Sequence, residues 1–229
     1  RRSYLDWGLF HVEPSFPGLF RDFRHALEQR NRLLKKSSLN PRELGVWDRQ
    51  IVAASDRIDR LRRDWLTRLE PVLERLLGEL APLPPVRLSL DSGWPERASL
   101  QALIEEERPR DMARGFTGRG AHRADLRLSS DAGPVRDVFS RGQTKSLAYV
   151  LILAQLELLV REAGRSCLVL VDDLGSELDR EHRRAVLRII ERLGQQTIFT
   201  ALAADDDLLA PLDQDIRMFH VEHGTLKAR

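Results

Sequence analysis

Two adjacent carboxylates follow an apolar run in the second half of the chain. The run Cys167-Leu-Val-Leu-Val171 ends directly at Asp172 and Asp173. A buried strand that ends in acids places carboxylates at the carboxyl edge of a sheet, where open α/β folds bind nucleotides. In P-loop NTPases one such acid holds Mg²⁺, and the next can orient the attacking water. Because apolar runs that end in aspartate are common, solvated acids at a strand end are an equal alternative for this motif alone.

A second set of polar residues opens an apolar helix that precedes this strand. Its sequence is Ser140-Arg-Gly142-Gln143-Thr-Lys145. A hydroxyl and a glycine amide at a helix N-terminus can cradle phosphate, helped by unpaired N–H groups and the helix dipole. The alternative is a plain capping box, because Ser140 and Gln143 have the Ser-x-x-Gln spacing. Both can hold together, but a cap needs neither Gly142 nor Lys145, so the full string favours phosphate contact.

A third motif, Ser176-Glu-Leu-Asp179, comes directly after the acid pair. Taken alone, it is equally well explained as the N-cap of the helix expected over 180–193.

Alternating helices and strands must position these three motifs. Helices are predicted at 143–162, 180–193 and 205–210, and strands at 166–172, 196–201 and near 216–222. Continuous apolar runs are typical of a sheet buried on both faces. The alternation predicts α/β architecture for the chain from Ser140 onward.

Helical spacing dominates residues 1–81. Apolar side chains recur every seven positions at Ile51, Ile58, Trp65 and Val72. Two to three heptads predict a short helical hairpin or arm rather than an extended coiled coil, and Pro71 is expected to kink or interrupt it. The tryptophans are expected to pack in the core or the hairpin rather than to stack on bases; they are Trp7, Trp47, Trp65 and Trp94.

The middle of the chain, 82–139, combines strand and turn signals. Strands are predicted at 86–90, 124–129 and 135–139, and a helix at 100–107. An arginine-rich stretch between them contains a single acid, Asp111; its arginines are Arg108, Arg110, Arg114, Arg119 and Arg123. Such a stretch suits DNA phosphates, with an affinity that falls steeply with salt. For any single arginine, a solvated loop or an internal ion pair is the favoured alternative.

Composition limits the classes of protein that these motifs can belong to. Of 229 residues, 42% are apolar and 31% are charged, the balance of a soluble folded protein. No apolar stretch approaches the roughly 18–20 residues of a membrane span. A single cysteine excludes a disulfide framework and a cysteine-based zinc site, and it fits a reducing cytosol. The histidines show no metal-site spacing, so no metal is expected beyond nucleotide-bound Mg²⁺.

The order and spacing of the three motifs resemble the signature motif, Walker B and D-loop of an SMC-related ABC-type ATPase. Other segments are similar to the RecF family, and the likeness covers essentially the whole chain. They are 1–6, 29–35, 171–179 and Gly120-Ala-His-Arg-Ala-Asp-Leu126, where the family has Gly-Pro-His-Arg-Asp-Asp-Leu. Because the chain opens without Met and no Gly-x-x-x-x-Gly-Lys-[Ser/Thr] occurs in it, we expect a fragment that lacks its N-terminal third, including the P-loop.

The resemblance implies a fold and a division into domains. The fold would be α/β, a partial ABC-type (P-loop NTPase) ATPase head with an inserted helical arm subdomain. The arm would occupy 1–81, a strand-containing connection 82–139 and the head 140–229.

The resemblance also implies roles for the motif residues. Family members bind ATP between two protomers, and the closed dimer grips DNA. Asp172 would hold Mg²⁺ and Asp173 would be the catalytic acid. The γ-phosphate of ATP held by the other protomer would be faced by Ser140, Gly142, Gln143 and Lys145. The D-loop residues Ser176 and Asp179 would lie at the dimer seam.

The biology implied by the family is cytoplasmic gap repair and replication. An ATP-driven homodimer would recognise single- and double-stranded DNA at gaps and, with RecO and RecR, help RecA to load. Two departures predict slow turnover. Asp173 stands where most ABC ATPases have Glu, and the last core strand, expected at 196–201, brings no switch His, so that Thr200 within it is the only stand-in. The chain alone should not hydrolyse ATP. The alternative is a nucleotide-independent DNA- or protein-interaction module; an SMC-like structural ATPase is disfavoured because the arm is short.

Overall fold

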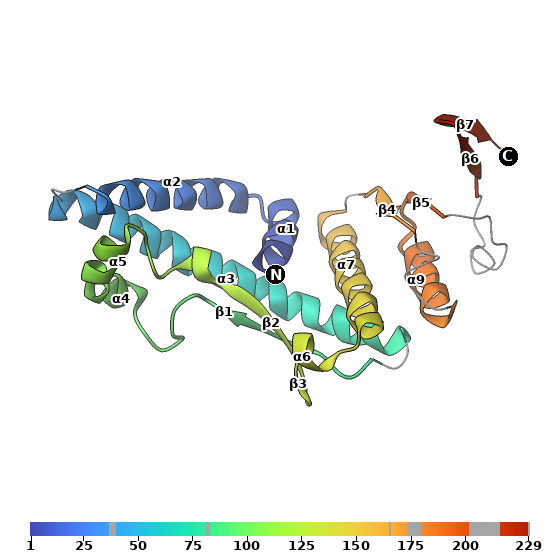
Figure 1. Ribbon diagram of the computed structural model, residues 1–229, viewed down its shortest axis with the longest axis horizontal. Coiled ribbons are helices and arrows are strands. Elements are labelled where there is room, and N and C mark those ends of the chain that lie inside the picture. Colours follow the sequence, from blue (N-terminus) through green and yellow to red (C-terminus); the bar gives the residue numbers. More distant parts are fainter. Residues whose placement is uncertain (37–39, 81–82, 165, 174–179, 202–215, 229) are drawn as a thin grey trace.

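A long helical hairpin forms the first part of the protein. The computed structural model describes residues 1–36, 40–80, 83–164, 166–173, 180–201 and 216–228. Figure 1 shows α2 lying alongside the first part of α3, with α1 next to the beginning of α2 and α3 continuing past it. These helices are α1 (Arg2–Val12), α2 (Phe16–Leu34) and α3 (Pro41–Glu79). The residues of the seven-residue repeat are all buried, with exposures of 0% at Ile51, Ile58 and Trp65 and 3% at Val72. The predicted helical hairpin is therefore confirmed.

Helix α3 continues through Pro71 as one helix of 39 residues, so the predicted interruption is wrong. Proline removes one backbone donor from the helix interior, which normally destabilises it. Here the apolar side chains on both sides of the proline, including Leu69, Val72 and Leu73, are almost completely buried. Their packing compensates for the missing hydrogen bond.

A three-stranded antiparallel sheet follows the hairpin, in the order β1-β2-β3. Its strands are β1 (Arg87–Asp91), β2 (Asp125–Ser130) and β3 (Gly133–Pro134). Between β1 and β2 come α4 (Leu100–Glu106), α5 (Arg108–Arg114) and a short 3-10 helix, η1 (Ala121–Arg123). The strand predicted at 135–139 is instead the helix α6 (Val135–Val138). Phe139 donates its backbone N–H to the Val135 carbonyl at 3.0 Å, which closes a helical turn before a strand can form.

The C-terminal part alternates helices and strands as expected. It contains α7 (Arg141–Ala163), β4 (Val169–Val171), α9 (Arg180–Leu193) and β5 (Thr197–Phe199). Strands β4 and β5 pair in parallel, with Val169 opposite Thr197. A separate antiparallel hairpin is formed by β6 (Phe219–Glu222) and β7 (Thr225–Ala228). The helix predicted at 205–210 lies outside the described residues.

The prediction that the sheet is buried on both faces is wrong for the described strands. Val171 is 7% exposed and belongs to the apolar cluster that α7 and α9 share, and Val169 packs against that cluster. The alternating side chains face the other way, because successive residues of a strand point to opposite faces. Leu168, Leu170 and Ile198 are accordingly 54%, 69% and 51% exposed. Within the part of the chain that is described, packing covers one face of this sheet.

A single apolar cluster connects the three parts of the chain. It includes Leu5 of α1, Trp65 of α3, Leu126 of β2, Leu158 of α7 and Ile190 of α9. Helices of the first and last parts share this core, so the cluster does not mark a boundary at 81 or 139. The predicted division into arm, connection and head stays a prediction.

Candidate functional site

The carboxyl ends of β4 and β5 bring Thr200 against the two acids. The Thr200 backbone N–H donates to the Val171 carbonyl at 3.0 Å and so extends the parallel pairing by one residue. Its hydroxyl donates to Asp172 Oδ1 at 2.5 Å and accepts the backbone N–H of Asp173 at 2.9 Å. Thr200 therefore fixes both the Asp172 carboxylate and the chain direction after it, and the carboxyl edge of this sheet carries the expected acids.

Asp173 has an unusual backbone conformation, with φ of 46°. Left-handed backbone is uncommon for residues other than glycine, although aspartate tolerates it better than most. The turn takes Asp173 out of the line of β4. Asp172 is exposed and Asp173 is half-buried, so the two neighbouring acids occupy different environments.

The donor set at this edge suits a hard cation such as Mg²⁺. Asp172 and Thr200 offer a carboxylate and a hydroxyl oxygen, the ligand type that Mg²⁺ prefers. No group of three or more His, Cys, Asp or Glu side chains that could hold a metal occurs among the described residues. A cation here would therefore take its remaining ligands from nucleotide phosphates and water, which is the usual arrangement for Mg²⁺ at nucleotide sites.

The string that begins at Ser140 forms a complete capping box at the start of α7. The Ser140 hydroxyl accepts the Gln143 backbone N–H at 3.2 Å, and Gln143 Oε1 accepts the Ser140 N–H at 2.9 Å. The cap alone thus accounts for Ser140 and Gln143. It does not account for Gly142, where an added Cβ would meet only the Ser140 hydroxyl, at 4.0 Å. The phosphate role of Ser140, Gly142, Gln143 and Lys145 stays a prediction.

The two predicted nucleotide-contacting sets lie at opposite ends of α7 (Figure 1). Ser140 precedes the end of α7 that adjoins α6, whereas β4 and its acids follow the other end. A helix of 23 residues spans roughly 35 Å. The D-loop residues Ser176 and Asp179 lie outside the described residues.

The arginine-rich segment divides into paired and unpaired side chains. Arg108 donates to Asp48 at 3.0 Å, and Arg119 donates twice to Glu107, at 2.8 and 2.9 Å. The hydrogen bond from Arg119 holds the pKa of Glu107 below its ordinary value. For Arg108 and Arg119 the alternative of an internal ion pair is therefore confirmed. Arg110, Arg114 and Arg123 are exposed and form no ion pair with any residue that the structure describes.

A buried ion network holds this segment on the helical hairpin. Arg30, which is fully buried, donates to Asp48 at 2.6 Å, to Asp111 at 2.7 Å and to the Thr117 hydroxyl at 2.9 Å. Asp111 also accepts the backbone N–H of Gly118 at 2.9 Å. The network joins α2, α3, α5 and the loop after α5. Sequence reasoning missed Arg30, because its partners are 18 and 81 residues away.

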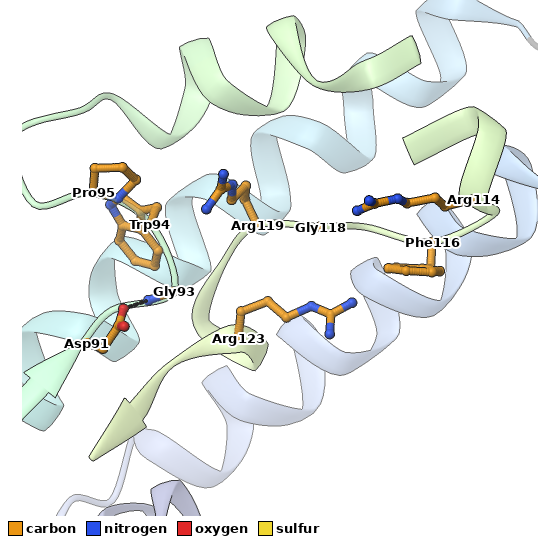
Figure 2. Close-up of a pocket in the computed structure, with 9 residues that line it drawn as sticks. All are labelled: Asp91, Gly93, Trp94, Pro95, Arg114, Phe116, Gly118, Arg119 and Arg123. Atoms are coloured by element: carbon orange, nitrogen blue, oxygen red, sulfur yellow. Dashed lines mark hydrogen bonds between the residues drawn. The ribbon is translucent and has the colours of Figure 1, made fainter. Parts of the chain in front are cut away.

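An open groove lies between the β1–α4 loop and the loop after α5, and Figure 2 shows its lining. Its volume is about 590 Å³. Trp94 and Pro95 lie on one side and Phe116 and Arg114 on the other, with Arg119 and Arg123 between them. The remaining lining residues are Asp91, Gly93 and Gly118. The sequence predicts that Trp94 packs in the core or the hairpin rather than stacking on bases, whereas the structure places it, half-buried, in the lining of this groove. No role was predicted for Phe116, although it lies inside the arginine-rich segment.

Two glycines allow the backbone of the β1–α4 loop to contact the backbone of the segment around η1. Gly93 has φ of 92° and Gly120 has φ of 125°, values that glycine adopts without penalty. A Cβ on Gly93 would lie 2.5 Å from the Gly120 carbonyl oxygen and 2.8 Å from the Ala124 nitrogen. The segment that begins at Gly120 therefore packs so closely on the β1–α4 loop that position 93 has no room for a side chain.

His122 of η1 is largely buried and uncharged at neutral pH. Its Nε2 lies 3.0 Å from the Thr117 carbonyl and must donate, because a carbonyl only accepts. Its Nδ1 is buried without a partner in the described structure. Burial lowers the pKa of His122 from its ordinary 6.5 to about 4, with further contributions from Arg123 and Arg2.

Stability is therefore expected to fall between neutral pH and pH 4. The unfolded chain takes up a proton on His122 below its ordinary pKa, but the folded protein does so only near the lowered pKa, so acid favours unfolding. From pH 7 to pH 5 this contributes about 2 kcal/mol. His122→Gln keeps a donor for Thr117 and does not titrate. Urea unfolding at the two pH values should show a smaller loss for the variant; an equal loss would contradict the assignment.

Known proteins resemble this chain in sequence and in fold. No protein-family model matches the chain. The chain is 41% identical over 227 residues to the DNA replication and repair protein RecF of Pseudomonas paraeruginosa, and the aligned part covers 98% of the chain and 61% of the relative. It is 40% identical over 229 residues to RecF of Pseudomonas fluorescens, with 62% of the relative covered. The chain thus spans about three-fifths of the length of these relatives.

Solved structures give the same result for the fold. Two structures of the recombination mediator protein RecF in the RecFOR pathway, one with ATP and one with ATPrS, match with TM-scores of 0.83 and 0.81. They cover the whole chain and 62% of each RecF structure, at 22% and 23% identity. No helix in the described part is both long and apolar enough to cross a membrane. The α/β fold of the chain is therefore confirmed as the fold of the aligned part of these RecF structures, and over its aligned length the chain is similar to RecF in both sequence and structure.

Proposed function

We propose that this chain is part of an ATP-gated DNA-binding protein of recombinational gap repair and replication. The observation that carries the proposal is 41% identity, over 98% of the chain, to proteins named DNA replication and repair protein RecF. The acids and Thr200 at the carboxyl edge of β4 and β5 support it independently. Nucleotides bind at that edge in α/β folds.

In this proposal the two polar sets act on different ATP molecules. Asp172, positioned by Thr200, would hold Mg²⁺ at the nucleotide of its own protomer, and Asp173 would orient water. Ser140, Gly142, Gln143 and Lys145 would contact the γ-phosphate of ATP bound by the partner protomer. The placement of α7 between the two sets supports this arrangement, because Ser140 precedes the helix whereas the acids follow the strand after it. ATP would then drive a homodimer.

DNA at gaps and the mediators RecO and RecR are the proposed partners, in the cytoplasm. The RecFOR pathway of the matching RecF structures supports mediators of this kind. Exposed arginines, including Arg110, Arg114 and Arg123, supply charge for DNA phosphates. The proposed arm (1–81), connection (82–139) and head (140–229) would move as the dimer closes.

ATP-driven dimerisation tests the proposal most directly. The experiment uses a fusion in which the remaining part of Pseudomonas paraeruginosa RecF, expected to carry the P-loop, precedes Arg1. Light scattering with ATP and Mg²⁺ should report a dimer for this fusion. Ser140→Arg should still bind ATP but remain monomeric, because a long cation at the start of α7 would obstruct the partner's γ-phosphate.

Ser140→Ala is the matched control, because Ser140 also caps α7. Loss of the cap weakens a helix by about 1 kcal/mol in either variant, whereas only arginine adds bulk. The alanine variant should therefore dimerise, with some loss of affinity. If the arginine variant dimerises like the unaltered fusion, the trans contact is wrong. If the fusion binds DNA equally well with and without ATP, the nucleotide-independent module is the better description.

A further inference from the structure

The groove of Figure 2 combines arginine side chains with aromatic rings on an open surface. Phe116 is 40% exposed, and Trp94 is half-buried, with part of its ring packed on the core. The Arg123 guanidinium lies over the Phe116 ring, 5.1 Å from its centre. Aromatic rings beside arginines are the combination that proteins use to stack bases and bind phosphates of single strands.

The charge of the groove is positive where a ligand would lie. Of its three arginines, Arg119 is paired with Glu107, whereas Arg114 and Arg123 form no ion pair within the described ranges. The one acid of the lining, Asp91, is paired with Arg127 from the neighbouring strand and accepts the Gly93 N–H at 3.0 Å. An anion therefore meets two uncompensated guanidinium groups and a neutralised carboxylate.

Buried hydrogen bonds hold the loop after α5, which forms one side of the groove, in a defined conformation. Thr117, next to Phe116, is 1% exposed. Its N–H and its hydroxyl both donate to Asn31 Oδ1 at 2.8 Å, and its hydroxyl also accepts from Arg30. These contacts hold Phe116 outward at a set position. A ligand that binds to a preformed surface loses little affinity to ordering of the protein.

We propose that this groove is a binding site for single-stranded DNA that takes one or two nucleotides. Arg114 and Arg123 would bind phosphates through their guanidinium forks, and bases would stack on Trp94 or Phe116. The inference rests on the proposed function, DNA binding, and narrows it to a strand form and a surface. Paired bases are not free to stack on protein side chains, so an intact duplex would use the arginines alone.

Binding of a labelled oligonucleotide to the full chain tests this site. The probe is fluorescein-labelled (dT)12, compared with a 12-base-pair duplex, by anisotropy over a series of salt concentrations. Arg114→Gln with Arg123→Gln should weaken (dT)12 binding about tenfold. The plot of log affinity against log salt concentration has a negative slope, and this slope should become shallower by about 1.4. Each lost phosphate contact of a single strand accounts for about 0.7.

Matched controls separate the groove from net charge. Arg87→Gln with Arg136→Gln removes the same two charges from exposed arginines outside the groove. This control should change (dT)12 binding less than twofold. Equal weakening by the control and groove variants would overturn the site.

The aromatic rings are tested without any change of charge. Trp94→Leu and Phe116→Leu keep apolar bulk but remove the stacking surface, which is expected to weaken (dT)12 binding about tenfold for a stacked base and leave duplex binding almost unchanged. In addition, (dT)12 that carries 5-iodouracil should crosslink to the peptides of Trp94 or Phe116. Circular dichroism melting confirms that each variant is folded. Unchanged (dT)12 affinity and crosslinks elsewhere would overturn the proposal.

The outcomes distinguish this inference from the function on which it rests. If the groove variants bind DNA normally, the groove assignment fails while the DNA-binding function stands. If the groove binds (dT)12 as expected but the fusion shows no ATP-driven dimer, the site stands and the ATP-gated function fails. If the chain binds no DNA at low salt but binds a labelled acidic peptide through Arg114 and Phe116, the groove is a protein-docking surface and the inference is wrong.

Discussion

Replacement of Arg30 by methionine is expected to lower the free energy of unfolding by about 3–5 kcal/mol. The guanidinium is fully buried and serves Asp48, Asp111 and Thr117. Without it, two carboxylates that are 1% and 2% exposed lose their main counter-charge. Among the described residues, Asp48 would retain Arg108 as a partner, and the Asp111 carboxylate would retain the Gly118 N–H alone. Domains of ordinary stability unfold with about 5–15 kcal/mol, so this one change would remove a large part of the total.

A neighbouring arginine of the same helix provides the control. Arg32 pairs with Glu28 one helical turn earlier, and its side chain is 65% exposed. Surface pairs of this kind contribute about 0.3–0.5 kcal/mol. Urea unfolding followed by circular dichroism should therefore separate Arg30→Met from Arg32→Met by several kcal/mol. Equal effects would show that the buried network is not a major source of stability.

Neutralising the stranded acids tests the cause of the loss. If Arg30→Met destabilises by leaving charged carboxylates in the core, Asp48→Asn and Asp111→Asn added to it should recover part of the stability. Each amide can still accept a hydrogen bond but carries no charge. No recovery in the triple variant would mean that the lost packing of the arginine stem, rather than stranded charge, explains the effect.

The elements that begin and end with local signals were predictable from sequence. Helix α9 ends at Leu193, as its pattern predicts, and α7 begins directly after the Ser140 cap. The heptad positions of α3 are buried because one helical face repeats. In contrast, the strand predicted at 135–139 failed, since Pro134 and a turn hydrogen bond favour a short helix there.

The groove and the buried network could not be predicted, because distant segments assemble them. Arg30 meets Asp111 across 81 positions, and Trp94 faces Phe116 from another loop. Helix α5 was missed for a different reason: its arginines indicated a solvated loop, although Pro109 in its first turn is a helix-start signal. The Thr200 contact was partly predictable, because Thr200 lies near the carboxyl end of the strand expected at 196–201.

Hydrolysis by the fusion protein is expected to depend most strongly on Asp172. A metal-bound phosphoryl group gains several kcal/mol of transition-state stabilisation from the cation, and a loss of about 3 kcal/mol corresponds to roughly 150-fold in rate. Asp172→Asn keeps the size of the side chain and its contact with Thr200 but removes the charge that holds Mg²⁺. Phosphate release at saturating ATP should fall by about a hundredfold or more, with nucleotide binding retained. Unchanged turnover would exclude Asp172 as the metal-site acid.

Thr200 extends the same test to the residue that orients this acid. Its hydroxyl donates to Asp172 and accepts from the Asp173 N–H, so Thr200→Val removes both contacts at constant shape. Loss of a partner that orients a metal ligand typically reduces metal affinity or activity about 10- to 100-fold. Thr200→Ser keeps the hydroxyl and should retain most turnover. A titration with Mg²⁺ gives the decisive reading: the valine variant should need more Mg²⁺ for half-maximal rate, whereas a defect in folding alone would lower the rate at every concentration.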